Sequence, residues 1–208
     1  MADFLVEIGT EELPPKALMN LANAFHDHIA SGFRNNTFGF GKTKVFATPR
    51  RIAVLLENLD KQAPSKEITI WGPPTKIAFD AAGEPTAAGI AFAKKNNIPI
   101  ESLSKMIGNN QGKEKLFCKS KKPGLKVEDL TENLIREAIS ALPIPKKMRW
   151  GSNAFEFIRP LQWVLILFGN KIINSQVMGL KASNITYGHR FHSKNQIIVN
   201  EPREYEPC

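Results

Sequence analysis

The sequence opens, after three residues, with Phe4-Leu5-Val6-Glu7-Ile8-Gly9, and this run together with the segment that follows it decides the fold. Its alternating apolar side chains predict a short strand with one buried face, formed by Phe4, Val6 and Ile8. Pro14-Pro15 then opens a predicted helix, with Gly32 as its end. Apolar side chains recur at helical spacing inside it: Leu18, Leu21, Ala22, Phe25 and Ile29. A strand followed by an amphipathic helix indicates a mixed αβ start.

The rest of the chain alternates between strand-like and helix-like patterns. We expect strands at 45–48, 52–56, 67–71, 115–120, 161–168, 171–178, 185–191 and 196–199, with a Gly-Asn turn joining 161–168 to 171–178. Pro49 separates the second strand from the third, and Gly72-Pro73-Pro74 is a predicted break. Helices are expected at about 86–97 and 127–142, both rich in alanine or lysine.

These elements predict an α+β fold, a mixed sheet-and-helix core with an inserted, partly helical subdomain. The division we expect is an αβ segment at 1–72, an inserted helical and basic subdomain at 73–145, and a β-rich segment at 146–208 that packs with the first. The 208 residues, 42% of them hydrophobic, are enough to bury such a core without covalent staples.

The cysteine content and the N-terminus predict a cytoplasmic protein with no membrane partner. Cys118 and Cys208 are the two cysteines, which is typical of a reducing compartment and leaves no disulfide framework. The N-terminus lacks a basic region followed by a long apolar run. The longest apolar stretch, 163–168, is far shorter than a membrane span.

The net charge of +8 is unevenly distributed. Residues 61–125 hold 11 basic and 5 acidic side chains, so the middle of the chain carries most of the excess. A basic surface favours polyanions such as RNA through counterion release. A solvated lysine-rich face gives the same count in proteins that bind no nucleic acid, so charge alone leaves both interpretations open.

Several segments resemble catalytic or metal-binding motifs but lack residues or spacings that those motifs require. Gly39-Phe40-Gly41-Lys42-Thr43 resembles the end of a phosphate-binding loop, but Asn36 stands where the first glycine is required. His26 and His28 point to nearly opposite sides of a helix, and His189 and His192 are separated across a predicted strand. We therefore expect no metal site and no catalytic residue in this chain.

Arginine, lysine and aromatic residues gather in short clusters that are harder to dismiss. Such side chains suit phosphates and unstacked bases, and they equally suit carboxylates at a subunit interface. The residues alone favour neither. The candidate contacts to RNA or to a partner subunit are Arg50, Arg51, Lys147, Arg149, Arg159, His189 and Arg190.

Taken together, several segments resemble one family. Phe4-Leu5-Val6-Glu7-Ile8-Gly9-Thr10-Glu11-Glu12-Leu13-Pro14 is similar to the opening Leu-Glu-Ile-Gly-Thr-Glu-Glu-Leu-Pro of bacterial glycyl-tRNA synthetase β subunits. Ala47-Thr48-Pro49-Arg50-Arg51-Ile52-Ala53 resembles that family's Thr-Pro-Arg-Arg-Leu-Ala. Further segments match in the same order, at 72–74, 78–80, 83–86, 145–151, 157–163 and 186–191.

The resemblance implies an α2β2 glycine–tRNA ligase, with partners that are the α subunit, glycine tRNA and the remainder of the β subunit. In such an enzyme the α subunit carries the catalytic core, so ATP and Mg belong to the holoenzyme and no cofactor is expected in this segment. The chain resembles about the first third of a β subunit, before the anticodon-binding region. A looser similarity to B3/B4-type domains is also implied.

Three roles follow from this resemblance. The leading one is a scaffold that supports tRNA binding and heterotetramer assembly during glycyl-tRNA formation. The second is a purely structural subunit-interface module. The third is an editing-type deacylase in which His189 or Glu11-Glu12 would handle protons.

Overall fold

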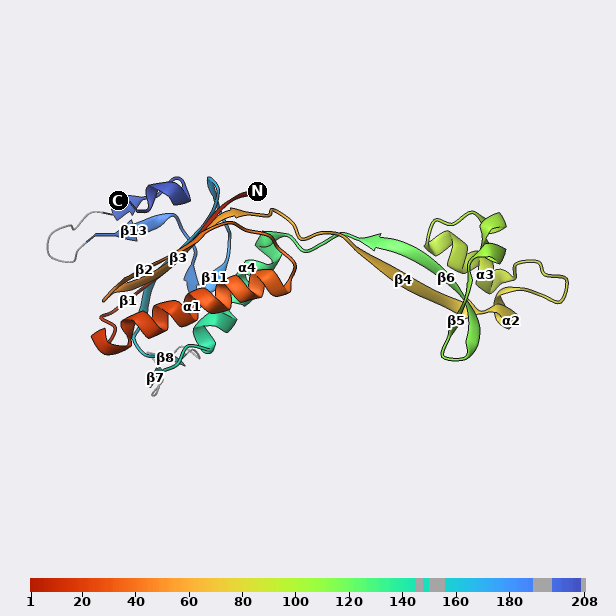
Figure 1. The fold of residues 1–208 in the computed structure, drawn as a ribbon, viewed down its shortest axis with the longest axis horizontal. Helices are drawn as coiled ribbons and strands as arrows, with labels where there is room; N and C mark the ends of the chain where they lie inside the picture. The colour runs from red at the N-terminus through yellow and green to blue at the C-terminus, as the bar shows by residue number, and fades with distance from the viewer. Residues whose placement is uncertain (145–147, 150–155, 189–195, 207–208) are drawn as a thin grey trace. The chain divides into compact units, whose positions relative to one another are not determined.

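The computed structural model describes residues 1–144, 148–149, 156–188 and 196–206 (Figure 1). Both helices and sheets are present, which confirms the predicted α+β class. The chain divides into two units, one made of residues 1–64 and 125–208 and the other of residues 65–124. We call them unit 1 and unit 2.

Unit 1 is built on a five-stranded antiparallel sheet in the order β10-β9-β1-β3-β2. Its strands are β1 (Ala2–Thr10), β2 (Thr43–Thr48), β3 (Arg51–Leu59), β9 (Leu161–Phe168) and β10 (Lys171–Ile172). The central strand β1 pairs with β3 on one side and with β9 on the other. A strand from the start of the chain therefore lies beside one from its C-terminal part.

Two helices cover one face of this sheet, α1 (Pro15–Asn35) and α4 (Val127–Ser140) (Figure 1). The side chains of β1 that point to them are fully buried, as the alternation predicted: Phe4, Val6 and Ile8. Phe33 of α1 meets the ring of Phe4 edge to face at 5.2 Å between centroids. This layer is the main hydrophobic core.

Gly32 does not end the first helix, and that prediction is wrong. The helix continues to Asn35, with Gly32 inside its last turns. A Cβ added at Gly32 would overlap the side chain of Leu134 on α4. The glycine is present because α4 crosses closely at this point, which a sequence pattern read within one helix cannot show.

The opposite face of the sheet is covered by the C-terminal part of the chain. Here β13 (Ile185–Tyr187) pairs with β14 (Gln196–Ile198), and the short helix η2 (Pro202–Glu204) follows. The second core lies between these segments and the sheet: Leu5, Ala53, Leu55, Leu165, Leu167, Val199 and Tyr205. Burial, together with the Glu7 carboxylate, raises the pKa of the Tyr205 phenol.

Two predicted C-terminal strands are shorter than expected. The run 171–178 is divided into β10 and β11 (Gln176–Val177). After β11 a turn at Met178-Gly179 folds the chain back, so that β11 pairs with β12 (Leu180–Lys181). Both turn residues have positive φ, 49° and 84°. The run 185–191 is a strand only to Tyr187, and its residues 189–191 lie outside the described part.

A further pair of short strands follows α4, β7 (Met148–Arg149) and β8 (Glu156–Phe157). No helix in the described residues is long and apolar enough to cross a membrane.

Unit 2 is a three-stranded antiparallel sheet with helices on one face. The strands are β4 (Lys66–Pro74), β5 (Ile107–Asn110) and β6 (Lys113–Lys122), in the order β4-β6-β5. The helices are α2 (Thr75–Ala78), α3 (Ala87–Lys95) and η1 (Ile100–Lys105). Their small core consists of Ala78, Phe92, Ala93, Leu103, Leu116 and Cys118.

Two details of unit 2 differ from the sequence analysis. The strand β4 runs through the predicted break to Pro74, which an edge strand tolerates because its outer N–H groups need no partner. The strand β5 was not predicted; it is joined to β6 by a turn at Gln111-Gly112, both with positive φ.

The unit boundaries at 65 and 124 also differ from the predicted insertion at 73–145. The strand β4 pairs with β6 from Lys66 to Trp71 and again at Pro74, so residues 66–72 belong with unit 2. The helix α4 packs against α1 instead, so residues 127–140 belong with unit 1.

We expect Gly32→Ala to destabilise unit 1 by about 1–3 kcal/mol, because the added methyl overpacks the contact between α1 and α4. Alanine is the better helix former, so propensity alone predicts the opposite sign. Urea unfolding followed by circular dichroism measures the difference. Combined with Leu134→Ala, the same substitution should cost much less, and an unchanged cost would contradict this account of the helix crossing.

Candidate functional site

Segments far apart in the sequence meet at one end of the unit 1 sheet, where β1 ends and β3 begins. The backbone N–H of Thr10 donates to the carbonyl of Arg50 at 2.8 Å, and that of Leu13 donates to Pro49 at 2.6 Å. The N–H of Glu11 donates to the carbonyl of Pro160 at 3.1 Å. The runs 9–14, 48–51 and 159–163 therefore form one junction, which we call the motif junction.

A buried carboxylate lies beside this junction. Glu7 is on β1, on the sheet face opposite the helices, and is 0% exposed. The hydroxyl of Thr186 lies 2.7 and 2.9 Å from its two oxygens, and the indole N–H of Trp163 donates to it as well. Burying an ionised carboxylate is costly unless it is hydrogen-bonded and paired. Glu7 receives both kinds of partner.

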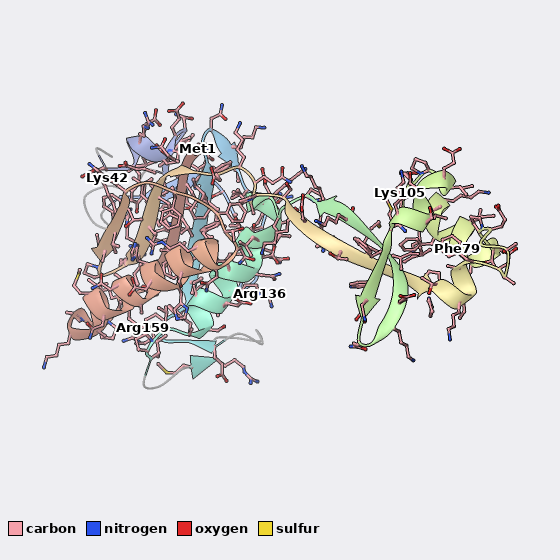
Figure 2. The ribbon with its side chains drawn as sticks, turned by 45° about the vertical axis from the view of Figure 1, so that its right-hand side comes forward. Met1, Lys42, Phe79, Lys105, Arg136 and Arg159 are labelled. Atoms are coloured by element: carbon pink, nitrogen blue, oxygen red, sulfur yellow. The ribbon has the colours of Figure 1, made fainter. Side chains whose placement is uncertain are left out.

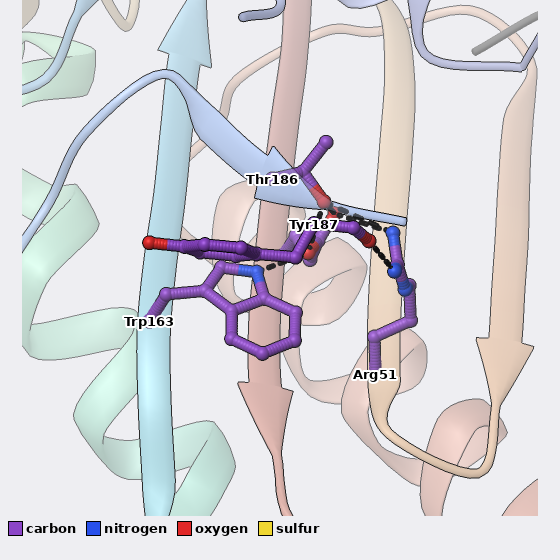
Figure 3. A network of polar contacts seen from close by, with 5 residues as sticks. Arg51, Trp163, Thr186 and Tyr187 are labelled. Atoms are coloured by element: carbon purple, nitrogen blue, oxygen red, sulfur yellow. Dashed lines mark hydrogen bonds and ion pairs between the residues drawn. The ribbon is translucent and has the colours of Figure 1, made fainter. Parts of the chain in front are cut away.

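The paired cation is Arg51. Its Nη1 lies 3.9 Å from Glu7 Oε2 and donates to the Thr186 hydroxyl at 2.9 Å, while its Nη2 donates to the carbonyl of Tyr187. Thr186 thus accepts from the guanidinium and donates to the carboxylate. Figure 3 shows Arg51, Trp163, Thr186 and Tyr187 turned toward one another. With Glu7 they form what we call the Glu7 network.

Aromatic rings extend the Glu7 network. The rings of Trp163 and Tyr187 lie 4.9 Å apart between centroids, tilted by 57°. The guanidinium carbons of Arg50 and Arg51 lie 5.9 and 5.7 Å from the Trp163 ring, which is within cation–π range. Gly9 leaves room for this indole, because a Cβ at Gly9 would overlap it.

The remaining predicted contact residues are placed differently. Arg159 is exposed and its Nε donates to the carbonyl of Glu12 at 3.1 Å, so it lies at the motif junction with Arg50. Arg149 is on β7 and its Nη2 lies 3.6 Å from Glu156, with both side chains at least half exposed. Lys147, His189 and Arg190 lie outside the described residues.

This arrangement separates cations that face inward from cations that face outward. Arg51 is occupied by the Glu7 network and its side chain is 18% exposed. Arg159 and Arg149 present their guanidinium groups at the surface, and Arg50 is half-buried beside the Trp163 indole. Within the described residues, no group of three or more His, Cys, Asp or Glu side chains could hold a metal ion.

Glu7 itself was missed as a functional residue, and so were Trp163 and Thr186. One signal was available in the sequence: Glu7 is a lone charge inside an apolar strand, which requires a partner if the strand is central. Its partners are 44 to 179 positions away, and nothing in local spacing identifies them.

Comparison with known proteins gives one consistent result. The family model described as "Glycyl-tRNA synthetase beta subunit" matches residues 4–208. The chain is 41% identical over 203 residues to the glycine–tRNA ligase β subunit of Stutzerimonas stutzeri strain A1501, and 43% identical over 204 residues to that of Marinobacter nauticus. Each match covers 98% of this chain and 29% of the relative, so the chain spans under a third of their length.

We expect Thr186→Val to destabilise unit 1 by about 1–3 kcal/mol, because it leaves the Glu7 carboxylate without its hydroxyl donor while nearly keeping side-chain volume. Thr186→Ser keeps the hydroxyl and is the matched control. Chemical unfolding monitored by near-ultraviolet circular dichroism, to which Trp163 contributes together with the other aromatic residues, measures both. Equal losses in the two variants would show that the hydroxyl contributes nothing to the Glu7 network.

Proposed function

The chain belongs to the glycyl-tRNA synthetase β-subunit family, and on that premise we propose that it supports tRNA binding and assembly with the α subunit during ATP-dependent glycyl-tRNA formation. The observation that carries this proposal is the match over residues 4–208, which includes every segment of the motif junction. The partners proposed are the α subunit, glycine tRNA and the rest of the β subunit, in the cytoplasm.

The outward cations of unit 1 are the proposed contact points. Arg149 and Arg159 are exposed, and Arg50 adjoins Arg159 at the motif junction. Guanidinium groups bind phosphate oxygens through paired N–H donors, and they remain charged at every physiological pH. Arg51 has a different role in this proposal: it holds the Glu7 network together and so positions the segments that carry Arg50 and Tyr187.

The proposed role of this segment is not catalytic. The buried carboxylate and its arginine are committed to each other and are closed to a substrate. From the family resemblance we assign aminoacylation, with its ATP and Mg, to the α subunit of the holoenzyme.

A second candidate function is a purely structural interface module. The specific observation in its favour is that Arg51 and Arg149 already have carboxylate partners within the chain, Glu7 and Glu156. Such pairs fit a surface that adjusts to a protein partner by exchanging ion pairs. If this second function is correct, the affinity for tRNA does not depend on these arginines, whereas the first function requires that it does.

A salt series with the full α and β complex tests the proposal. We expect Arg149→Gln and Arg159→Gln each to weaken binding of glycine tRNA and to reduce the slope of log K against log salt by about one. Arg136→Gln is the matched control, since Arg136 is half exposed and pairs with Glu132 at 3.9 Å on α4. Size-exclusion chromatography of each variant reports assembly in parallel.

Two outcomes would separate the candidates. If tRNA affinity and salt slope stay unchanged while the variants lose the α subunit, the interface module is the correct function. If neither tRNA binding nor assembly changes, the outward cations of unit 1 have neither role and the proposed contact points are wrong.

A further inference from the structure

The sheet of unit 2 has one covered face and one open face. On β6, Leu116 and Cys118 point to the helices and are buried in the unit 2 core. Because side chains alternate along a strand, Lys115, Phe117, Lys119 and Lys121 point the other way. In the register of the sheet, these residues lie opposite Glu67, Thr69 and Trp71 on β4 and Gly108 on β5.

Two aromatic rings lie at the centre of the open face. Trp71 is directly opposite Phe117 in the ladder, and their ring centroids are 5.7 Å apart at a tilt of 47°. The side chain of Trp71 is 40% exposed, and Phe117 is half-buried. Gly108 adds no side chain of its own: a Cβ there would come within 2.9 Å of Phe117 and 3.2 Å of Trp71. The rings therefore extend across β5 as a continuous apolar platform.

Neither ring is needed to form the core of unit 2, which lies on the other side of the sheet. An exposed apolar residue is by itself ordinary on a protein surface. What distinguishes this one is the charge around it. Lys119 lies opposite Thr69 and Lys115 lies opposite Gly108, so a lysine follows the aromatic pair on each side along β6. Lys121 lies one same-face position further along, opposite the carboxylate residue Glu67.

The charge of the whole unit agrees with this local picture. Residues 65–124 contain 10 lysines, no arginine and 5 acidic residues, so they carry 10 − 5 = +5 of the net +8. The open face is thus the aromatic part of the most basic section of the chain. A peptide partner would have to place acidic side chains on both sides of an apolar one, whereas a nucleic acid strand supplies phosphates and π-faces in every unit.

We propose that the open face of the β4-β6-β5 sheet binds unpaired nucleotides of an RNA, with a base stacked on Trp71 and Phe117 and the adjacent phosphates held by Lys115, Lys119 and Lys121. The proposal rests on the proposed function, in which the β subunit binds tRNA, and it adds the kind of RNA element recognised. Stacking tolerates any base, and lysines contact phosphate as point charges, so this face selects single-stranded character more than sequence.

The test uses the full α and β complex and two probes, glycine tRNA and an eight-nucleotide single-stranded oligoribonucleotide, by fluorescence anisotropy. We expect Trp71→Leu to weaken oligonucleotide binding about tenfold, and Trp71→Phe, which keeps an aromatic face, to weaken it far less. Ile77→Ala is the matched control, because Ile77 is 58% exposed on α2 of the same unit. Circular dichroism of each variant checks that the fold is kept.

The lysines supply a second, independent measurement. Lys119→Gln and Lys121→Gln should each lower the salt slope of oligonucleotide binding by about 0.7, the single-strand value per phosphate contact. The control is Lys94→Gln on α3. Ultraviolet cross-linking of wild-type complex to the oligonucleotide should place the cross-link on the peptide that carries Trp71 or Phe117.

The outcomes distinguish this inference from the proposed function. If wild-type complex binds glycine tRNA with a salt slope, but Trp71→Leu and the lysine variants bind both probes like wild type, the inference is overturned and the proposed function stands. Cross-links only outside β4 and β6 would overturn it equally. If wild-type complex binds no glycine tRNA, the proposed function itself fails.

Discussion

The fold of unit 1 depends on how one carboxylate is satisfied. Glu7 is in the middle of the central strand, completely buried, and its charge would be prohibitive without partners. The partners come from three other places in the chain: Arg51 on β3, Trp163 on β9 and Thr186 on β13 (Figure 3). Satisfying one charge therefore fixes the relative positions of the central strands and of the C-terminal segment that covers them.

This constraint explains why three of the segments that resemble the family, at 9–14, 48–51 and 159–163, lie together. The backbone bonds from Thr10, Glu11 and Leu13 close the end of the sheet, and the Glu7 network holds its face. The cationic side chains exposed to solvent include the outward arginines in unit 1 and lysines of β6 in unit 2. Side chains from both units project widely from the ribbon (Figure 2). A buried, fully paired charge inside and exposed basic side chains outside are the features on which the proposed role in tRNA binding rests.

Sequence periodicity predicted the elements with strong local signals and failed where tertiary contacts decide. The strands β1, β3 and β9 and the helix α4 were found from alternation and helical spacing. Gly32 was wrongly predicted to end the helix. A glycine is needed there because the side chain of Leu134, about a hundred residues later, lies against it. Similarly, Arg50 and Arg51 are neighbours in sequence and were treated alike. One is half-buried beside an indole and the other neutralises Glu7, a difference that depends entirely on residues from β1, β9 and β13.

The coupling free energy between Glu7 and Arg51 tests most directly whether their interaction holds unit 1 together. A double-mutant cycle with Glu7→Gln, Arg51→Met and the double variant, measured by urea unfolding, isolates it. We predict that each single variant is strongly destabilised, by about 3–5 kcal/mol, and that the double variant loses about 1–3 kcal/mol less than the sum, since no buried charge is then left unpaired. Additive losses would show that the two groups act independently, and the central role given to their interaction would be wrong.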